Sequence, residues 1–161
     1  MLSVGAGRVL RLNASDGGVP KRAVERARVT VDGLLGDSQR DRRHHGGPER
    51  ALCLWSAERI EALVAEGHPV SPGSTGENVT VTGLDWSAVG PGARLVFAGG
   101  VELAVTDYAT PCATIRDSFA GARFERIHQQ RHPGWSRVYA RVLVPGELRR
   151  GEALELRAPE A

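Results

Sequence analysis

Cys112 is the residue of this sequence whose type and position are best suited to chemistry. It follows Thr110 and Pro111, and Pro111 holds Thr110 extended and closes the strand before it. The spacing of Ile115 and Phe119 predicts a short helix with Cys112 in its first turn. Unpaired backbone N–H groups there favour a thiolate, which is a nucleophile and a soft metal ligand. A buried, inert thiol at the strand end is the alternative.

A long polar loop, residues 36–48, is a candidate anion-binding segment. Its glycines let a ligand approach the backbone closely, and its arginines can donate paired hydrogen bonds to a phosphate. These candidate residues are Arg40, Arg42, Arg43, Gly46 and Gly47. Because Asp37, Asp41 and Glu49 offset most of that positive charge, a solvated surface loop is the alternative. A second polar loop, residues 71–78, ends at Asn78, which can bind a ligand or merely bond its own turn.

Three other constellations offer weaker chemistry. His128 and His132 are spaced to share a helix face for zinc, but no third ligand is evident and solvated histidines are favoured. His44 and His45 beside Asp37 and Asp41 form a possible metal cluster, although alternate residues rarely converge. A Cys112–His45–Asp37 hydrolase triad lacks any local elbow or oxyanion motif.

The elements that must position these residues are mostly short strands. β-branched or alternating patterns predict strands at residues 9–12, 27–31, 49–55, 78–82, 94–97, 101–106, 138–144 and 153–156. Gly99 and Gly100 provide the positive φ angles of a tight hairpin. Many short strands with glycine and proline turns indicate a mostly β fold, a barrel or a sandwich. Cys53 lies in the strand at 49–55 and is interpreted as a small buried hydrophobe.

Two helices are predicted beside the strands. The first is capped by Ser56, carries an apolar stripe of Ile60, Leu63 and Val64, and stops at Gly67. The second spans residues 122–130. On the strand at 138–144 and just before it, Arg137, Tyr139 and Arg141 alternate and are expected to face water.

Composition places the chain among ordinary globular proteins. Its 161 residues fit one domain, residues 1–161. The content of 41% hydrophobic and 25% charged residues is typical of a folded globular protein and argues against disorder. No apolar run approaches the ~18 residues of a membrane span, and no secretory signal is apparent, so we expect a cytoplasmic protein. Because 21 basic residues are offset by 19 acidic ones, nucleic acid is not an expected partner, whereas small anionic ligands are.

An ordered set of short motifs resembles the MOSC domain family, the molybdenum-cofactor sulfurase C-terminal domains. The correspondence runs from about Val4 to Leu156, and its specificity comes from the order of the pieces. These are Gly36-Asp37, His45-Gly46-Gly47 followed by Ala51, Gly76-Glu77-Asn78, Thr82-Gly83-Leu84, Pro111-Cys112, Pro145-Gly146-Glu147 and Gly151-Glu152. The resemblance implies a β-barrel with peripheral helices, a molybdopterin-type cofactor, and a cysteine that ligates molybdenum or carries sulfur.

Among family members, the chain is most similar to standalone YiiM-like reductases of N-hydroxylated compounds. By this resemblance Cys112 takes the family's cysteine position and Thr110 the small hydroxyl before it. Arg42, Arg43, His45, Gly46, Gly47 and Asn78 are expected to hold the cofactor. The chain departs from the group where Tyr108-Ala109 replaces an arginine ahead of the Pro-Cys pair, which removes a phosphate contact.

Three functions follow as hypotheses from the residues and the resemblance. In the first, Cys112 ligates molybdenum in an oxidoreductase that reduces N–O or S–O bonds of small substrates, with a redox partner as electron donor. In the second, Cys112 binds no metal and carries a persulfide in sulfur transfer, with a cysteine desulfurase as the sulfur donor. The missing arginine favours this hypothesis. In the third, the protein binds a pterin or sulfur compound without turnover.

Overall fold

The structure, a computed structural model, describes residues 1–37 and 47–159 of the chain. Its strands are β1 (Leu2–Ala14), β2 (Arg22–Val24), β3 (Arg26–Thr30), β4 (Gly33–Leu34), β5 (Leu52–Ser56), β6 (Val79–Thr82), β7 (Arg94–Phe97), β8 (Glu102–Tyr108), β9 (Val138–Val144), β10 (Gly146–Arg149) and β11 (Ala153–Ala158). The helices are α1 (Ala57–Ala65) and the 3-10 turns η1 (Pro48–Arg50), η2 (Trp86–Ala88), η3 (Ala113–Ser118), η4 (Ala120–Ala122) and η5 (Phe124–Ile127).

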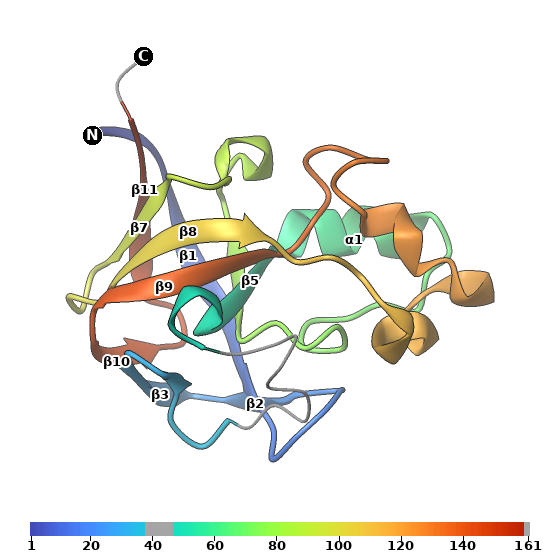
Figure 1. The fold of residues 1–161 in the computed structure, drawn as a ribbon, viewed down its shortest axis with the longest axis horizontal. Helices are drawn as coiled ribbons and strands as arrows, with labels where there is room; N and C mark the ends of the chain where they lie inside the picture. The colour runs from blue at the N-terminus through green and yellow to red at the C-terminus, as the bar shows by residue number, and fades with distance from the viewer. Residues whose placement is uncertain (38–46, 160–161) are drawn as a thin grey trace.

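The main sheet closes on itself as a barrel. Its strands follow the order β11-β7-β8-β9-β5-β6-β1-β2, and an additional pairing of β11 with β1 joins the two sides of the sheet. That pairing sets Leu2 opposite Ala158, so both termini lie at the same end of the molecule (Figure 1). A smaller sheet of β10, β3 and β4 lies below the barrel in this view. The prediction of a mostly β barrel is therefore confirmed.

Alternation along the strands explains why the barrel encloses an apolar core. In β7 the side chains of Leu95 and Phe97 are buried while Arg94 is exposed, and β11 repeats this pattern with Leu154 and Leu156. The hairpin predicted at Gly99-Gly100 joins β7 to β8, and Gly100 adopts a φ of 106°. Side chains that fill the core include Val9, Leu12, Leu54, Val79, Val81, Leu95, Phe97, Leu103, Val105, Val138, Ala140, Leu154 and Leu156.

Helix α1 connects β5 to the parallel strand β6 as a crossover. Ser56 caps it as predicted, because its hydroxyl accepts a hydrogen bond from the Arg59 N–H at 3.1 Å. Ile60 and Leu63 are buried, whereas Val64 is 51% exposed, so the predicted apolar stripe is narrower by one residue. No helix in the described part of the chain is long and apolar enough to cross a membrane.

The strand predicted at residues 9–12 is much longer in the structure, where β1 spans Leu2–Ala14, and two further predictions need correction. The strand expected at 49–55 begins at Leu52, because Pro48 starts the 3-10 turn η1, where its fixed φ suits the first turn of a helix. The second helix expected at 122–130 is wrong. Gly121 and Ala122 have φ angles of 63° and 57°, which a right-handed helix excludes, so the chain forms the separate turns η4 and η5.

Candidate functional site

Cys112 lies after β8 and immediately before η3. In Figure 1 the chain that follows β8 runs away from the end of the molecule where the two termini lie. Cys112 is half-buried and precedes η3 as its N-cap residue, with an extended backbone (φ −140°, ψ 176°). The prediction that Cys112 sits in the first turn of a helix is therefore wrong by one position, and the helix is a six-residue 3-10 helix. The backbone carbonyl of Cys112 accepts the first turn's bond from the Ile115 N–H at 3.1 Å.

Hydrogen bonds fix the segment that carries the thiol at both ends. Before it, the Ala109 N–H donates to the Arg137 carbonyl at 2.9 Å, which ties the segment to the start of β9. After it, the Ser118 hydroxyl and the Ser74 hydroxyl lie 2.9 Å apart, which ties η3 to the loop at 71–78. The segment that carries the thiol is therefore anchored to the start of β9 and to the loop at 71–78, two regions far apart in sequence.

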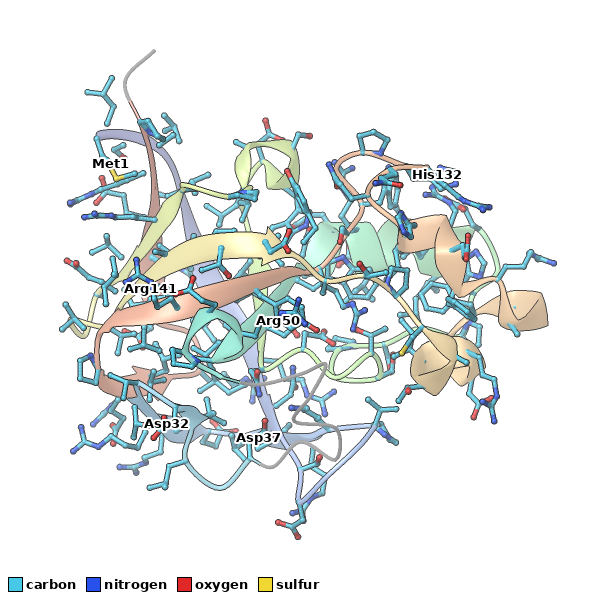
Figure 2. All side chains as sticks on the ribbon, viewed as in Figure 1. Met1, Asp32, Asp37, Arg50, His132 and Arg141 are labelled. Carbon is cyan, nitrogen blue, oxygen red and sulfur yellow. The ribbon has the colours of Figure 1, made fainter. Side chains whose placement is uncertain are left out.

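Asn78 uses its side chain to join the barrel to a buried ion pair. Its Oδ1 accepts from the Cys53 N–H at 3.0 Å, and its Nδ2 donates to Asp37 Oδ2 at 2.9 Å. The same Asp37 oxygen lies 2.6 Å from Lys21 Nζ, and both charged side chains are only 6% exposed. Asn78 therefore bonds strand β5 and Asp37 rather than its own turn. Asp37 lies below β9, towards β2 and β3, in Figure 2.

Glu77, beside Asn78, is a fully buried carboxyl group. Its oxygens accept hydrogen bonds from the Gly73 N–H at 3.1 Å, the Thr75 hydroxyl at 2.9 Å and the Thr80 hydroxyl at 3.0 Å. Burial raises the pKa of Glu77 above its ordinary value, although these hydrogen bonds act in the opposite direction. Glu77 therefore organises the loop at 71–78 from inside.

A small cluster of Cys53, Ala109 and Tyr139 forms the wall next to the thiol segment. Cys53 and Tyr139 are direct partners across β5 and β9. Burial raises the pKa of Cys53 to about 11, and it raises that of Tyr139 to about 12, with the Cys53 and Cys112 thiols adding to the shift of Tyr139. The Arg50 guanidinium lies 5.1 Å above the Tyr139 ring, and Figure 2 shows Arg50 beside β9.

Arg137 and Tyr139 correct the expectation that this face meets water. Arg137 is 6% exposed and Tyr139 5% exposed. The Arg137 side chain reaches the Thr75 carbonyl in the loop at 71–78, and Tyr139 clusters with Cys53 and Ala109. Arg141, further along β9, is exposed and pairs with Glu49 at 3.5 Å, so the expectation is right for that residue (Figure 2).

The guanidinium of Arg137 is incompletely satisfied. Its Nη1 donates to the Thr75 carbonyl at 2.8 Å, but its buried Nε has no hydrogen-bond partner among the described residues. Its charge acts to lower the pKa of both Cys53 and Tyr139, against the larger effect of burial. A buried cation therefore lies near the Cys53 and Tyr139 side chains.

Only some of the other predicted site residues lie in the described part of the chain. Gly47 precedes η1 with a φ of 82°, and Thr110 is exposed next to the buried Pro111. Arg40, Arg42, Arg43, His45 and Gly46 lie outside the described residues, as do His44 and Asp41. Within residues 1–37 and 47–159, no three His, Cys, Asp or Glu side chains gather as a metal site, so nothing there supports zinc at His128 and His132.

Sequence reasoning missed Lys21, Arg137 and Tyr139 as members of the site. No local motif marks Lys21, which lies next to the short edge strand β2 and reaches Asp37 through the fold. The spacing of Arg137 and Tyr139, two residues apart, predicts that their side chains lie on the same face of the chain at β9. Alternation does not reveal which chain segment packs on that face, because this depends on the tertiary structure.

Comparison with known proteins relates the chain to one family. A family model for the MOSC domain matches residues 41–155. YflK of Bacillus subtilis is 32% identical over 143 residues, which are 86% of this chain and 62% of YflK. YiiM of Escherichia coli is 32% identical over 135 residues, 80% of this chain and 58% of YiiM. The chain thus spans less than two thirds of the length of these relatives.

The fold is also found in solved structures. The crystal structure of the YuaD protein from Bacillus subtilis matches with a TM-score of 0.75 at 18% identity, covering 99% of this chain and 100% of that one. At such identity the match establishes the shared fold.

Proposed function

Since the chain belongs to the MOSC domain family, we propose that it binds a molybdenum cofactor and reduces N–O or S–O bonds of small substrates in the cytoplasm. In this proposal Cys112 provides the protein's sulfur ligand to molybdenum. A thiolate suits that role because it is a soft, strongly donating ligand.

The observation that carries the proposal is the different exposure of the two thiols. Cys53 and Cys112 are both free, but Cys53 is buried in β5 whereas Cys112 is half-buried between β8 and η3. Burial raises the pKa of Cys53 to about 11, which disfavours its thiolate. Cys112 is therefore the thiol that a metal can reach.

The charges around Cys112 fit a ligand that bears an acidic group. Arg137 is a buried cation whose Nε lacks a partner among the described residues, and Lys21 lies in the same polar interior, paired with Asp37. A molybdopterin carries a phosphate, and a guanidinium is well suited to bind it. The residues present therefore fit this cofactor.

The cofactor and the protein would have different roles in the reaction. When bound, the molybdenum cofactor supplies the two-electron chemistry of oxygen removal. For an N-hydroxylated substrate the balanced change is R2NOH + 2e⁻ + 2H⁺ → R2NH + H2O, with the electrons taken from an external redox partner. The chain's residues would hold the cofactor through Cys112 and Arg137, and the buried cluster of Cys53, Ala109 and Tyr139 lies beside the segment that carries the thiol.

The test is molybdenum content after anaerobic purification from a host that makes the cofactor. We expect wild type and Cys53→Ala to retain molybdenum and pterin, and Cys112→Ala to lose metal at least about tenfold, the loss that even outer-shell substitutions cause. Absence of molybdenum from the wild-type protein would contradict the proposal. Reduction assays with hydroxylamines and N-oxides and an artificial electron donor then separate an enzyme from a pure binding module.

The persulfide alternative has its own signature. The absence of a cation at Tyr108-Ala109 favours it, and it requires no metal. Incubation with a cysteine desulfurase and cysteine should add one labile sulfur to Cys112, detected by mass spectrometry and absent in Cys112→Ala. A metal-free protein that forms this adduct is a sulfur carrier, whereas a metal-free protein without it is neither.

A further inference from the structure

Arg137 is a buried cation without a matching anion in the described part of the chain. No carboxylate there lies within ion-pair distance of it, whereas Lys21 has Asp37 at 2.6 Å. Its one hydrogen bond goes to the neutral Thr75 carbonyl, at 2.8 Å. A buried guanidinium without an anion is strongly unfavourable, so its retention calls for a compensating ligand.

The nearby carboxyl group of Glu77 does not meet that need. It is fully buried and already accepts hydrogen bonds from Gly73, Thr75 and Thr80. Burial raises its pKa above the ordinary value, while these hydrogen bonds act in the opposite direction. Asp37 is likewise committed to Lys21 and Asn78.

Arg137 and Cys112 both lie near Tyr139. The residue lies just before β9, and its carbonyl accepts the Ala109 N–H that anchors the thiol segment. Its guanidinium acts electrostatically on Tyr139, which also senses the Cys112 thiol. Arg137 and Cys112 therefore border the same wall, formed by Cys53, Ala109 and Tyr139.

We propose that Arg137 is the anion-recognising residue of the Cys112 site and that the anion is a phosphate group. A guanidinium fork donates paired, charge-assisted hydrogen bonds to phosphate, which a lysine cannot reproduce. Where the phosphate belongs to the cofactor, this inference rests on the function proposed above. A phosphorylated substrate would present the same chemistry, and the experiment below separates the two sources.

The first arm uses metal-free protein from a host that cannot make the cofactor, titrated with inorganic phosphate at constant ionic strength. Wild type should gain about 5–10 °C in Tm at a phosphate concentration a hundred times its dissociation constant. Arg141→Met, which removes an exposed arginine of β9, should gain the same. Arg137→Met should show no phosphate-dependent gain, and Arg137→Lys, which keeps the charge and loses the fork, should bind phosphate at least about tenfold more weakly.

The outcomes of this arm decide the proposal. A wild-type Tm that does not respond to phosphate overturns it, as does Arg137→Met with a wild-type response, because Arg137 is then only a support for the Thr75 carbonyl. If Arg137→Met does not fold, phosphate titration of Arg137→Lys followed by ³¹P NMR decides in its place, and wild-type affinity there overturns the proposal.

The second arm uses protein from a host that makes the cofactor and measures pterin and molybdenum. Loss of pterin in Arg137→Met assigns the phosphate to the cofactor, whereas retained pterin with lost phosphate binding assigns it to a substrate. Wild-type protein that lacks molybdenum but binds phosphate through Arg137 contradicts the proposed function and leaves this inference intact.

Discussion

Replacing Asn78 by alanine removes two buried hydrogen bonds at once. The first leaves the Cys53 N–H without its acceptor at 3.0 Å, and an unpaired buried donor costs about 1–3 kcal/mol. The second removes the bond to Asp37 at 2.9 Å, and a bond to a charged group contributes about 1.5–3 kcal/mol. Because neighbouring terms are not additive, we expect a loss of about 3 kcal/mol in the free energy of unfolding.

The assay is chemical and thermal unfolding of the metal-free protein. A loss of that size corresponds to a fall in Tm of about 6–12 °C for a chain of this length. Thr82→Ala is the matched control. It deletes a side-chain hydrogen bond of 2.6 Å to Glu58 that is exposed, so water can replace the lost partner and the cost should be no more than about 1 kcal/mol. A loss below about 1 kcal/mol for Asn78→Ala would refute the reasoning, since Asn78 would then not position β5 and Asp37.

Two further predictions concern the buried carboxyl and the thiols. Burial raises the pKa of Glu77 above the ordinary 4.5, so between the unfolded and the folded pKa the folded state binds more protons than the unfolded state. The free energy of unfolding therefore falls as pH rises from about 4.5 towards the raised pKa. Glu77→Gln should therefore become less destabilising relative to wild type as pH rises from 4 upward in urea unfolding, and parallel stability curves would exclude this. Cys112 should react with a thiol reagent in the native protein at least about tenfold faster than Cys53, whose burial raises its pKa to about 11, and equal rates would contradict the different burial.

Much of the barrel could be predicted because its strands carry local signals. The strand at 94–97 agrees with β7 at both ends, and the one at 138–144 agrees with β9, since β-branched alternation and glycine turns mark them. Strands β2, β4 and β10 were missed, because they are only two to four residues long. That residues 1–161 form one domain stays a prediction.

The site was less predictable than the barrel, for a physical reason. Cys112 stood out because a proline and a predicted helix start flanked it, and both are local features. Arg137 looked like a surface arginine, because its burial involves the loop at 71–78, whose Thr75 carbonyl accepts a hydrogen bond from its Nη1. The partner of Asn78 is Asp37, 41 residues earlier, and no spacing rule relates the two.

The hydrogen bonds of the site separate residues that build it from residues that are available to a ligand. Asn78 and Glu77 bind protein partners with their side chains, so substitutions there should act first on stability and on the placement of the thiol. Cys112 is half-buried, and Arg137 keeps an unpartnered Nε among the described residues, so substitutions there should act first on binding. Because a buried, unmatched cation opposes folding, Arg137→Met should leave the metal-free protein as stable as wild type or more so while phosphate binding is lost. Loss of stability with unchanged binding would reverse that assignment and place Arg137 among the residues that build the site.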